Sequence, residues 1–129
     1  MEKHPVELLI ERADAAIMRE DFDALIDIYA DDAILVVQPG MIASGKTQIR
    51  RAFEAIAAHF GHSLVVEEAG MRVLEAGDTA LVLAKTVVSS AQTTQIERAA
   101  TYVFQRSQQG NWLCVIDNSY GHRLLDANE

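Results

Sequence analysis

Apolar and polar positions alternate with the period of amphipathic helices through the first part of the chain. An apolar stripe over residues 6–17 follows Pro5, a favourable first helical residue, and predicts a helix that ends near Glu20. Asp21 can cap a second, shorter helix whose apolar positions extend to Tyr29. The sequence therefore predicts two successive helices that each bury one face.

The next segment returns to a helix after a short extended stretch. Residues 33–37 predict a strand, and Gln38-Pro39-Gly40 has the chemistry of a turn. Residues 47–60 carry apolar side chains on one side and predict a third helix. Ser44 is expected to cap this helix, with Lys46 in its solvated first turn.

Beyond residue 63 the helical period disappears, and β-branched and aromatic residues cluster between turn signals. Four strands are expected, over residues 64–75, 79–89, 94–106 and 111–120. Connections of a few residues permit hairpins only, so the sheet should be antiparallel. Gly70 predicts a bulge that curves the sheet. Helices followed by an antiparallel sheet define an α+β fold, and residues 1–129 should form a single domain.

One segment matches a nucleotide-binding pattern. Gly40–Thr47 fits the glycine-rich phosphate loop, and Asp117 ends an apolar strand as magnesium-binding aspartates do. Such a loop requires a parallel sheet in which a neighbouring strand delivers the aspartate, and the short connections exclude that crossover. Met41 and Ile42 also place apolar bulk where phosphate oxygens would lie. We interpret the match as accidental and keep nucleotide binding as a remote alternative.

Composition narrows the possible partners. The formal net charge of −8 argues against nucleic acid and against an anionic membrane surface. No apolar stretch approaches the roughly twenty residues of a membrane span. Cys114 is the only cysteine, and no signal peptide follows the first residues, so a cytoplasmic protein is expected. The histidines and acids show no metal-ligand spacing, and neither a metal nor a cofactor is expected.

Three stretches of the chain carry a family pattern: Tyr29-Ala30-Asp31-Asp32-Ala33, Ser44-Gly45-Lys46 before a helix, and Tyr102-Val103-Phe104 followed by Trp112. Together they resemble the nuclear transport factor 2-like superfamily, nearest to its SnoaL-like and ketosteroid-isomerase-like group. The resemblance runs nearly from end to end. It implies a cone-shaped barrel, in which a strongly curved antiparallel sheet wraps the helices around a deep pocket, and pairing with a second copy.

The strand composition independently favours a homodimer. Residues 80–84 and 112–116 are apolar at every position, so both faces of these strands need covering. The helices can cover only one face. The other would expose a contiguous apolar patch, which usually marks an interface. We therefore expect a homodimer that pairs through the outer face of the sheet.

The same resemblance places one face of the closing strands toward the pocket. Strict alternation puts Val115, Asp117 and Ser119 on that face, and Arg98 and Tyr102 join them from the preceding strand. A carboxylate in an apolar cavity can act as a general base, and a tyrosine hydroxyl can donate to an oxyanion. Asp117 and Tyr102 are therefore the candidate catalytic residues. In the alternative interpretation Arg98 and Asp117 only neutralise each other, and Tyr102 only packs.

Other side chains are candidates for ligand contact. Tyr29 and Phe53 should form pocket walls, whereas Lys85, with Arg98, would attract an acidic end of the ligand. Cys114 is expected to point out of the pocket. The sequence thus predicts a homodimeric pocket protein for a small, mostly apolar ligand. The alternative is a lyase, isomerase or cyclase with Asp117 as base and Tyr102 as donor.

Catalytic residues of the better-known relatives are missing from this chain. Three catalytic positions of the steroid isomerases hold other residues here. Val37 and Gln38 occupy the place of the base. The position of the oxyanion tyrosine falls near Ala13, and that of the protonated aspartate falls near Tyr102. Relatives similar to limonene-epoxide hydrolase use an arginine between two aspartates, and Ala100 stands where one of those acids is needed. The resemblance therefore implies neither of these two reactions.

Overall fold

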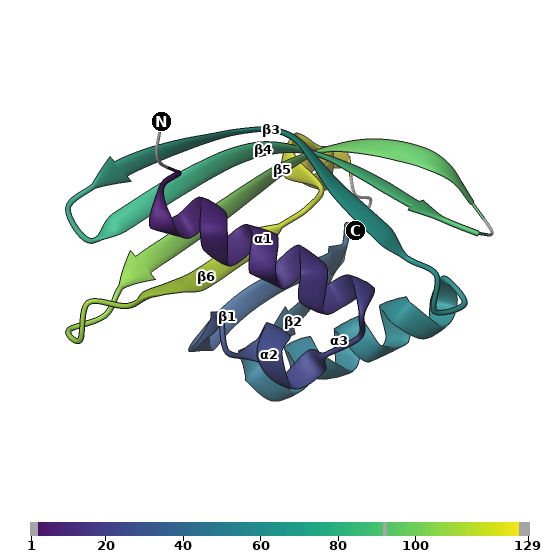
Figure 1. The fold of residues 1–129 in the computed structure, drawn as a ribbon, viewed down its shortest axis with the longest axis horizontal. Helices are drawn as coiled ribbons and strands as arrows, with labels where there is room; N and C mark the ends of the chain where they lie inside the picture. The colour runs from purple at the N-terminus through teal and green to yellow at the C-terminus, as the bar shows by residue number, and fades with distance from the viewer. Residues whose placement is uncertain (1–2, 92, 127–129) are drawn as a thin grey trace.

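The computed structural model describes residues 3–91 and 93–126 of the chain. Within them the order of elements is α1 (Pro5–Met18), α2 (Phe22–Ile26), β1 (Tyr29–Gln38), β2 (Met41–Ser44), α3 (Gly45–His59), β3 (Val65–Ala76), β4 (Thr79–Ser90), β5 (Thr93–Arg106), β6 (Trp112–Asn118) and the 3₁₀ helix η1 (Gly121–Asp126) (Figure 1). The expected α+β class is confirmed. No helix within these residues is both long and apolar enough to cross a membrane.

All six strands belong to one sheet in the order β2-β1-β6-β5-β4-β3. Neighbouring strands are antiparallel except β1 and β6, which are parallel. The expectation of a wholly antiparallel sheet was therefore wrong at one place. The chain between β1 and β6 contains α3 and four strands, which is long enough for the crossover that a parallel pair requires.

The boundary between α2 and β1 differs from the prediction. Tyr29 begins β1, whereas the apolar spacing had placed it in the second helix. The backbone N–H of Cys114 donates to the carbonyl of Ile28 at 2.7 Å, and Tyr29 is the register partner of Cys114. Pairing with β6 thus places in a strand a residue that the local apolar spacing assigns to a helix. Tertiary contacts often override local propensity in this way.

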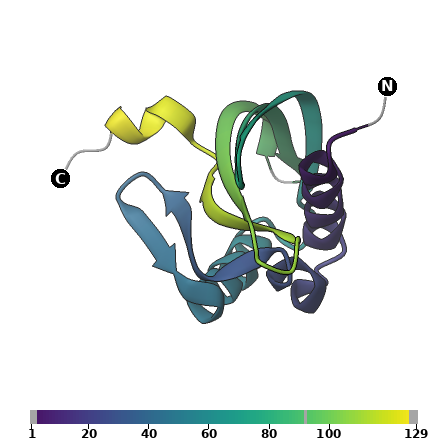
Figure 2. The same ribbon diagram turned by 90° about the vertical axis from the view of Figure 1, so that its left-hand side faces the viewer.

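Curvature gives the sheet its concave face. The long strands β3 to β5 arch over α1, while α3 packs against β1 and β2 (Figures 1 and 2). A bulge between Glu68 and Gly70, where Gly70 has a φ of +155°, confirms the predicted bend in β3. The largest fully buried side chains join the helices to the sheet: Val6, Leu25, Tyr29, Ile49, Val82, Phe104 and Cys114.

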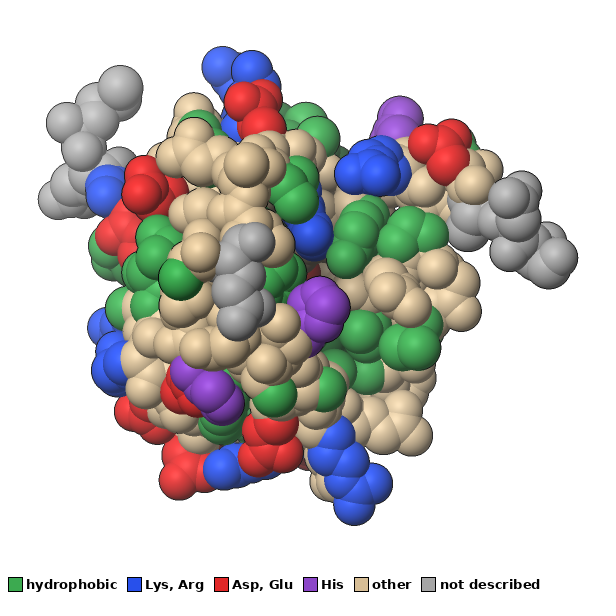
Figure 3. Space-filling model, turned by 90° about the vertical axis from the view of Figure 1, so that its right-hand side faces the viewer, with side chains coloured by type: hydrophobic (Ala, Val, Ile, Leu, Met, Phe, Trp, Pro, Cys, Tyr) green, Lys and Arg blue, Asp and Glu red, His purple; other side chains and the backbone are tan. Residues whose placement is uncertain are grey.

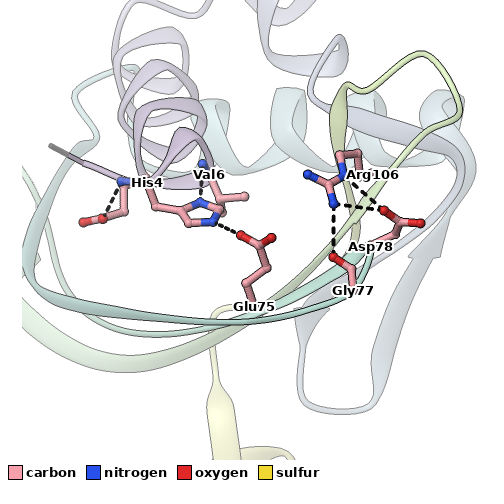
Figure 4. A network of polar contacts seen from close by, with 7 residues as sticks. His4, Val6, Glu75, Gly77, Asp78 and Arg106 are labelled. Carbon is pink, nitrogen blue, oxygen red and sulfur yellow. Dashed lines mark hydrogen bonds and ion pairs between the residues drawn. The ribbon is translucent and has the colours of Figure 1, made fainter.

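Polar contacts fix α1 across this concave face. Nδ1 of His4 accepts the backbone N–H of Val6 at 3.0 Å, which caps α1, while Nε2 lies 2.6 Å from Oε1 of Glu75 on β3 (Figure 4). Nearby, Nε of Arg106 donates to Oδ1 of Asp78 at 3.1 Å and joins β5 to the β3–β4 turn. The His4 contacts hold the start of α1 against β3, and α1 supplies one wall of a cavity.

The segment Gly40–Thr47 does not form a phosphate loop. It contains the β1–β2 turn, the edge strand β2 and the first residues of α3. β2 pairs with β1, with Leu35 opposite Ala43, so backbone N–H groups are used within the sheet and cannot cradle phosphate. Nζ of Lys46 lies 3.7 Å from Oδ1 of Asp31. The nucleotide alternative therefore loses its structural basis.

The start of α3 also departs from the prediction. Ser44 occupies the N-cap position, but its side chain makes no capping hydrogen bond. Instead, Oε1 of Gln48 accepts the backbone N–H of Ser44 at 2.9 Å. The helix begins at Gly45, two residues before the expected start at 47. The Gln48 side chain therefore satisfies the N–H of the N-cap residue, and the predicted serine cap is not formed.

Candidate functional site

A cavity of about 660 Å³ lies between α1, α3 and the concave face of the sheet. Its walls are mostly apolar, with Ile10, Ile17, Leu35, Phe53 and Ile56 among them. Exposed rim residues come from β2 and α3, namely Met41, Ile42, Gln48, Arg51 and His59. The face in Figure 3 is hollowed between two lobes, with hydrophobic side chains gathered beside the hollow. The cavity has the size and lining of a small-molecule site.

The structure brings most of the predicted site residues together. The cavity is lined by six of them: Tyr29, Phe53, Arg98, Tyr102, Asp117 and Ser119. The rings of Tyr29 and Phe53 pack with their centroids 6.2 Å apart. Lys85 is exposed between Ala84 and Thr86, both of which are buried. Lys85 is therefore on the outer side of β4 and cannot meet a ligand in the cavity, contrary to the prediction.

Val115 also lies outside the cavity lining, and a bulge in β6 is the reason. Tyr102 pairs with Asp117 and Phe104 pairs with Cys114, so two steps along β5 match three steps along β6. Val115 is the extra residue, without a register partner on β5, and the strict alternation assumed from the sequence fails there. Cys114 is not among the lining residues, in agreement with the expectation that it points out of the pocket, and it is buried in the core, 2% exposed.

Asp117 is the central polar group of the cavity. It is 8% exposed, and the hydroxyl of Tyr29 donates to its Oδ2 at 2.6 Å. Its Oδ1 is buried without a well-directed hydrogen bond from any described residue. Burial raises the pKa of Asp117 to about 6, against the opposing effect of the Tyr29 and Ser119 hydroxyls. Asp117 is thus mostly ionised at neutral pH and close to the value that suits a general base.

Arg98 does not neutralise Asp117. Its guanidinium lies over the ring of Tyr120, 4.4 Å from the centroid, and its Nε is buried without a hydrogen-bond partner among the described residues. No ion pair joins Arg98 to Asp117 in the part of the chain that the structure describes. The cation–π contact holds the arginine in place while leaving it able to meet an acceptor.

Asp14 of α1 is a cavity residue that the sequence analysis missed. Burial raises the pKa of Asp14 strongly, and a hydrogen bond with Glu68 of β3, the charge of Glu68 and the charge of Asp117 raise it further. A signal was available, because Asp14 interrupts the apolar stripe formed by Ile10 and Ile17. A carboxylate on the apolar face of an amphipathic helix is unusual and indicates a special environment.

Tyr102 lies among these acids. Burial raises the pKa of its hydroxyl well above the ordinary value, and the charges of Asp117, Glu68 and Asp14 add to the shift. The phenol therefore stays protonated and remains a hydrogen-bond donor. Among the described residues, no group of three or more histidine, cysteine, aspartate or glutamate side chains has an arrangement that could hold a metal ion. The arrangement offers one ionised carboxylate and several protonated oxygens inside an apolar cavity.

Comparisons with known proteins agree with this geometry at the level of fold. A protein of unknown function from Pseudomonas putida KT2440 is 24% identical, covers 87% of this chain and 80% of its own, and has a TM-score of 0.77. A protein from Streptomyces avermitilis, provisionally assigned as a dehydratase, is 25% identical over 87% of this chain and 89% of its own, with a TM-score of 0.69.

A third solved structure extends the range of relatives. A protein from Shewanella frigidimarina, provisionally assigned as a ketosteroid isomerase, is 12% identical, covers 84% of this chain and 89% of its own, and has a TM-score of 0.73. A comparison with curated proteins found no match. The family model described as a SnoaL-like domain matches residues 6–115. The chain has the nuclear transport factor 2-like fold and belongs to the SnoaL-like domain family.

Proposed function

We propose that this protein binds a small, mostly apolar molecule in the cavity. The observation that carries this proposal is that two buried polar atoms inside an apolar enclosure, Oδ1 of Asp117 and Nε of Arg98, have no well-directed hydrogen bond with any residue that the structure describes. A buried polar atom without a partner is costly, by about 1–3 kcal/mol. A ligand that offers a donor to Asp117 and an acceptor to Arg98 would remove that cost while its body fills the apolar space.

Filling the cavity is expected to block binding. We propose to measure the fluorescence of 8-anilinonaphthalene-1-sulfonate, whose apolar rings and anionic group suit the walls and Arg98. Ala52→Phe places bulk on a lining residue of α3 and should weaken binding roughly tenfold or more. Ala58→Phe, on an exposed position of the same helix outside the lining, is the matched control. Equal affinity in both variants, with unchanged circular dichroism, would show that the cavity is not the binding site.

A second candidate function is proton transfer on the bound molecule, as in a lyase, isomerase or cyclase. The position of Asp117 favours it, because a buried carboxylate with one unpaired oxygen faces the cavity. Tyr102, its register partner on β5, would donate to an oxygen that becomes negative during the reaction. The provisional dehydratase assignment of the Streptomyces avermitilis relative agrees with this class of reaction.

We also propose that two copies pair through the outer face of the sheet. Register partners form a continuous apolar row across five strands, from Leu74 through Leu81, Val103 and Ile116 to Ile34. Leu74, Ile116 and Ile34 are 51%, 41% and 37% exposed, respectively, in the single chain. A contiguous apolar row of this kind is typical of an interface, and a second copy offers the same row in return.

A charge in this row should separate the copies. Val103→Glu places a carboxylate at the centre of the proposed interface, facing its own counterpart, and should convert the dimer into a monomer at micromolar concentration. Sedimentation velocity measures the change. Leu125→Glu is the control, because Leu125 is 83% exposed on η1, away from the row. A wild-type monomer, or a Val103→Glu variant that remains dimeric, would contradict the proposed pairing.

A further inference from the structure

Two carboxyl groups meet at the wall of the cavity formed by α1 and β3. Asp14 lines the cavity, whereas Glu68 is not among the described lining residues. Besides burial, side-chain hydrogen bonding with Glu68 and the charge of Glu68 both raise the pKa of Asp14, which makes the two carboxyl groups close neighbours across α1 and β3. Both carboxylate oxygens of Glu68 are buried, and no N–H or O–H donor among the described residues reaches them. A hydrogen bond between two carboxyl groups requires a proton on one of them.

The surroundings leave no other way to balance the charge. The titratable groups that act on Asp14 are Glu68 of β3, Asp117 of β6 and Glu11 of its own helix, and all three are acids. Tyr102 of β5 lies among the same carboxyls. Arg51 and Arg98 line the cavity, but neither is among the groups that act on Asp14, and Arg98 is held over Tyr120. Two ionised carboxylates cannot share such a site, so one of them retains its proton.

A second, independent observation points to a ligand at this place. Asp117 is 8% exposed, lines the same cavity as Asp14, and has one buried oxygen without a well-directed hydrogen bond from the described part of the chain. The cavity therefore presents an ionised carboxylate and a protonated carboxyl pair from different elements. Groups with such opposite protonation states are the usual acid and base of proton-transfer sites.

We propose that Asp14 and Glu68 share one proton and act together as the acid of the cavity, opposite Asp117 as the base. This inference rests on the proposed proton-transfer function and names its substrate class, a molecule with a hydroxyl group β to a carbonyl. Asp14 fronts the cavity and is the residue that delivers the proton. Glu68 is a positioning residue that keeps the proton on the pair.

The reaction that this arrangement supports is loss of water. Asp117 takes the proton from the carbon next to the carbonyl, and a carbon–carbon double bond forms as the carbon–oxygen bond breaks. The departing hydroxyl takes the proton from Asp14 and leaves as water. The proton on Asp117 then returns to the carboxyl pair, directly or through that water, and restores the starting state. No oxidant or reductant is consumed.

Infrared spectroscopy of the ligand-free protein tests the shared proton directly. At about pH 8 the carboxyl of Asp117 is ionised, so a protonated carboxyl carbonyl band should come from the pair alone. We expect the band in wild type and in Glu67→Gln, a control at an exposed neighbour on β3. Asp14→Asn should abolish it, and Glu68→Gln should weaken it or move it to lower pH. A band that is absent from wild type, or that persists in Asp14→Asn, overturns the proposal.

Two probe substrates separate this inference from the proposed base. 5-Nitrobenzisoxazole has a good leaving group and needs a base only, whereas 4-hydroxy-4-phenylbutan-2-one loses water and needs an acid as well. Asp14→Asn should slow the second reaction by at least roughly tenfold more than it slows the first, because only the second needs the acid. Equal effects of Asp14→Asn on both probes would overturn the role as acid. If Asp117→Asn retained both reactions, the proposed role of Asp117 as the base would be contradicted instead.

Discussion

Asp117→Asn is expected to lower the rate of base-promoted ring opening of 5-nitrobenzisoxazole by roughly 10²–10⁴-fold, the usual contribution of a positioned general base. The amide keeps the shape of the side chain and can still accept from Tyr29, but it cannot take a proton. The substrate is small and apolar, so it suits the cavity, and its product is followed by absorbance. kcat/KM is the quantity to compare.

The pH profile provides a second signature of the same residue. kcat/KM of the wild type should rise as pH increases through about 6 and then level off, because Asp117 is active only when ionised. Asp32→Asn is the matched control, since Asp32 is exposed and lies outside the cavity lining. Retention of more than half of the wild-type rate in Asp117→Asn would show that another group, or solvent base, performs the reaction.

Local pattern was sufficient to predict most of the fold. The apolar stripe behind Pro5 predicted α1, and Gly70 predicted the bulge in β3, because each depends on residues adjacent in sequence. The parallel pairing of β1 with β6 was not predictable in this way. It is made by residues far apart in the chain, such as Leu35 and Asp117, and no local spacing encodes it. The same pairing moved Tyr29 from a helix to a strand.

The candidate site was predictable only in part, for a related reason. Period-two alternation correctly placed Tyr102 and Asp117 beside the cavity, but it failed at Val115, where the bulge adds a residue to one strand only. Asp14 and Glu68 were missed because they come from different elements, and their proximity depends on how α1 crosses β3. The protonation of a pair of acids depends on their burial and on the distance between them, and local sequence patterns predict neither.

The free energy of unfolding should increase as the pH falls from about 8 to about 5. Burial raises the folded-state pKa of Asp117 from 3.8 to about 6, so between these values the folded protein binds more protons than the unfolded chain. The stability linked to Asp117 is thus fully present below 3.8 and is lost as the pH rises through about 6. Asp14 contributes with the same sign.

Urea unfolding across this pH range measures the effect, and comparison with Asp117→Asn isolates it. A shift of about two pKa units in a buried group corresponds to about 3 kcal/mol between the fully protonated and fully ionised states. Relief of the overall negative charge also favours the acidic side, but that contribution remains in the variant. The gain on acidification should therefore be smaller in Asp117→Asn by up to this amount. If the free energy of unfolding changed with pH equally in the two proteins, Asp117 would not be a buried carboxylate with a raised pKa. The proposal that Asp117 is a general base would then be contradicted.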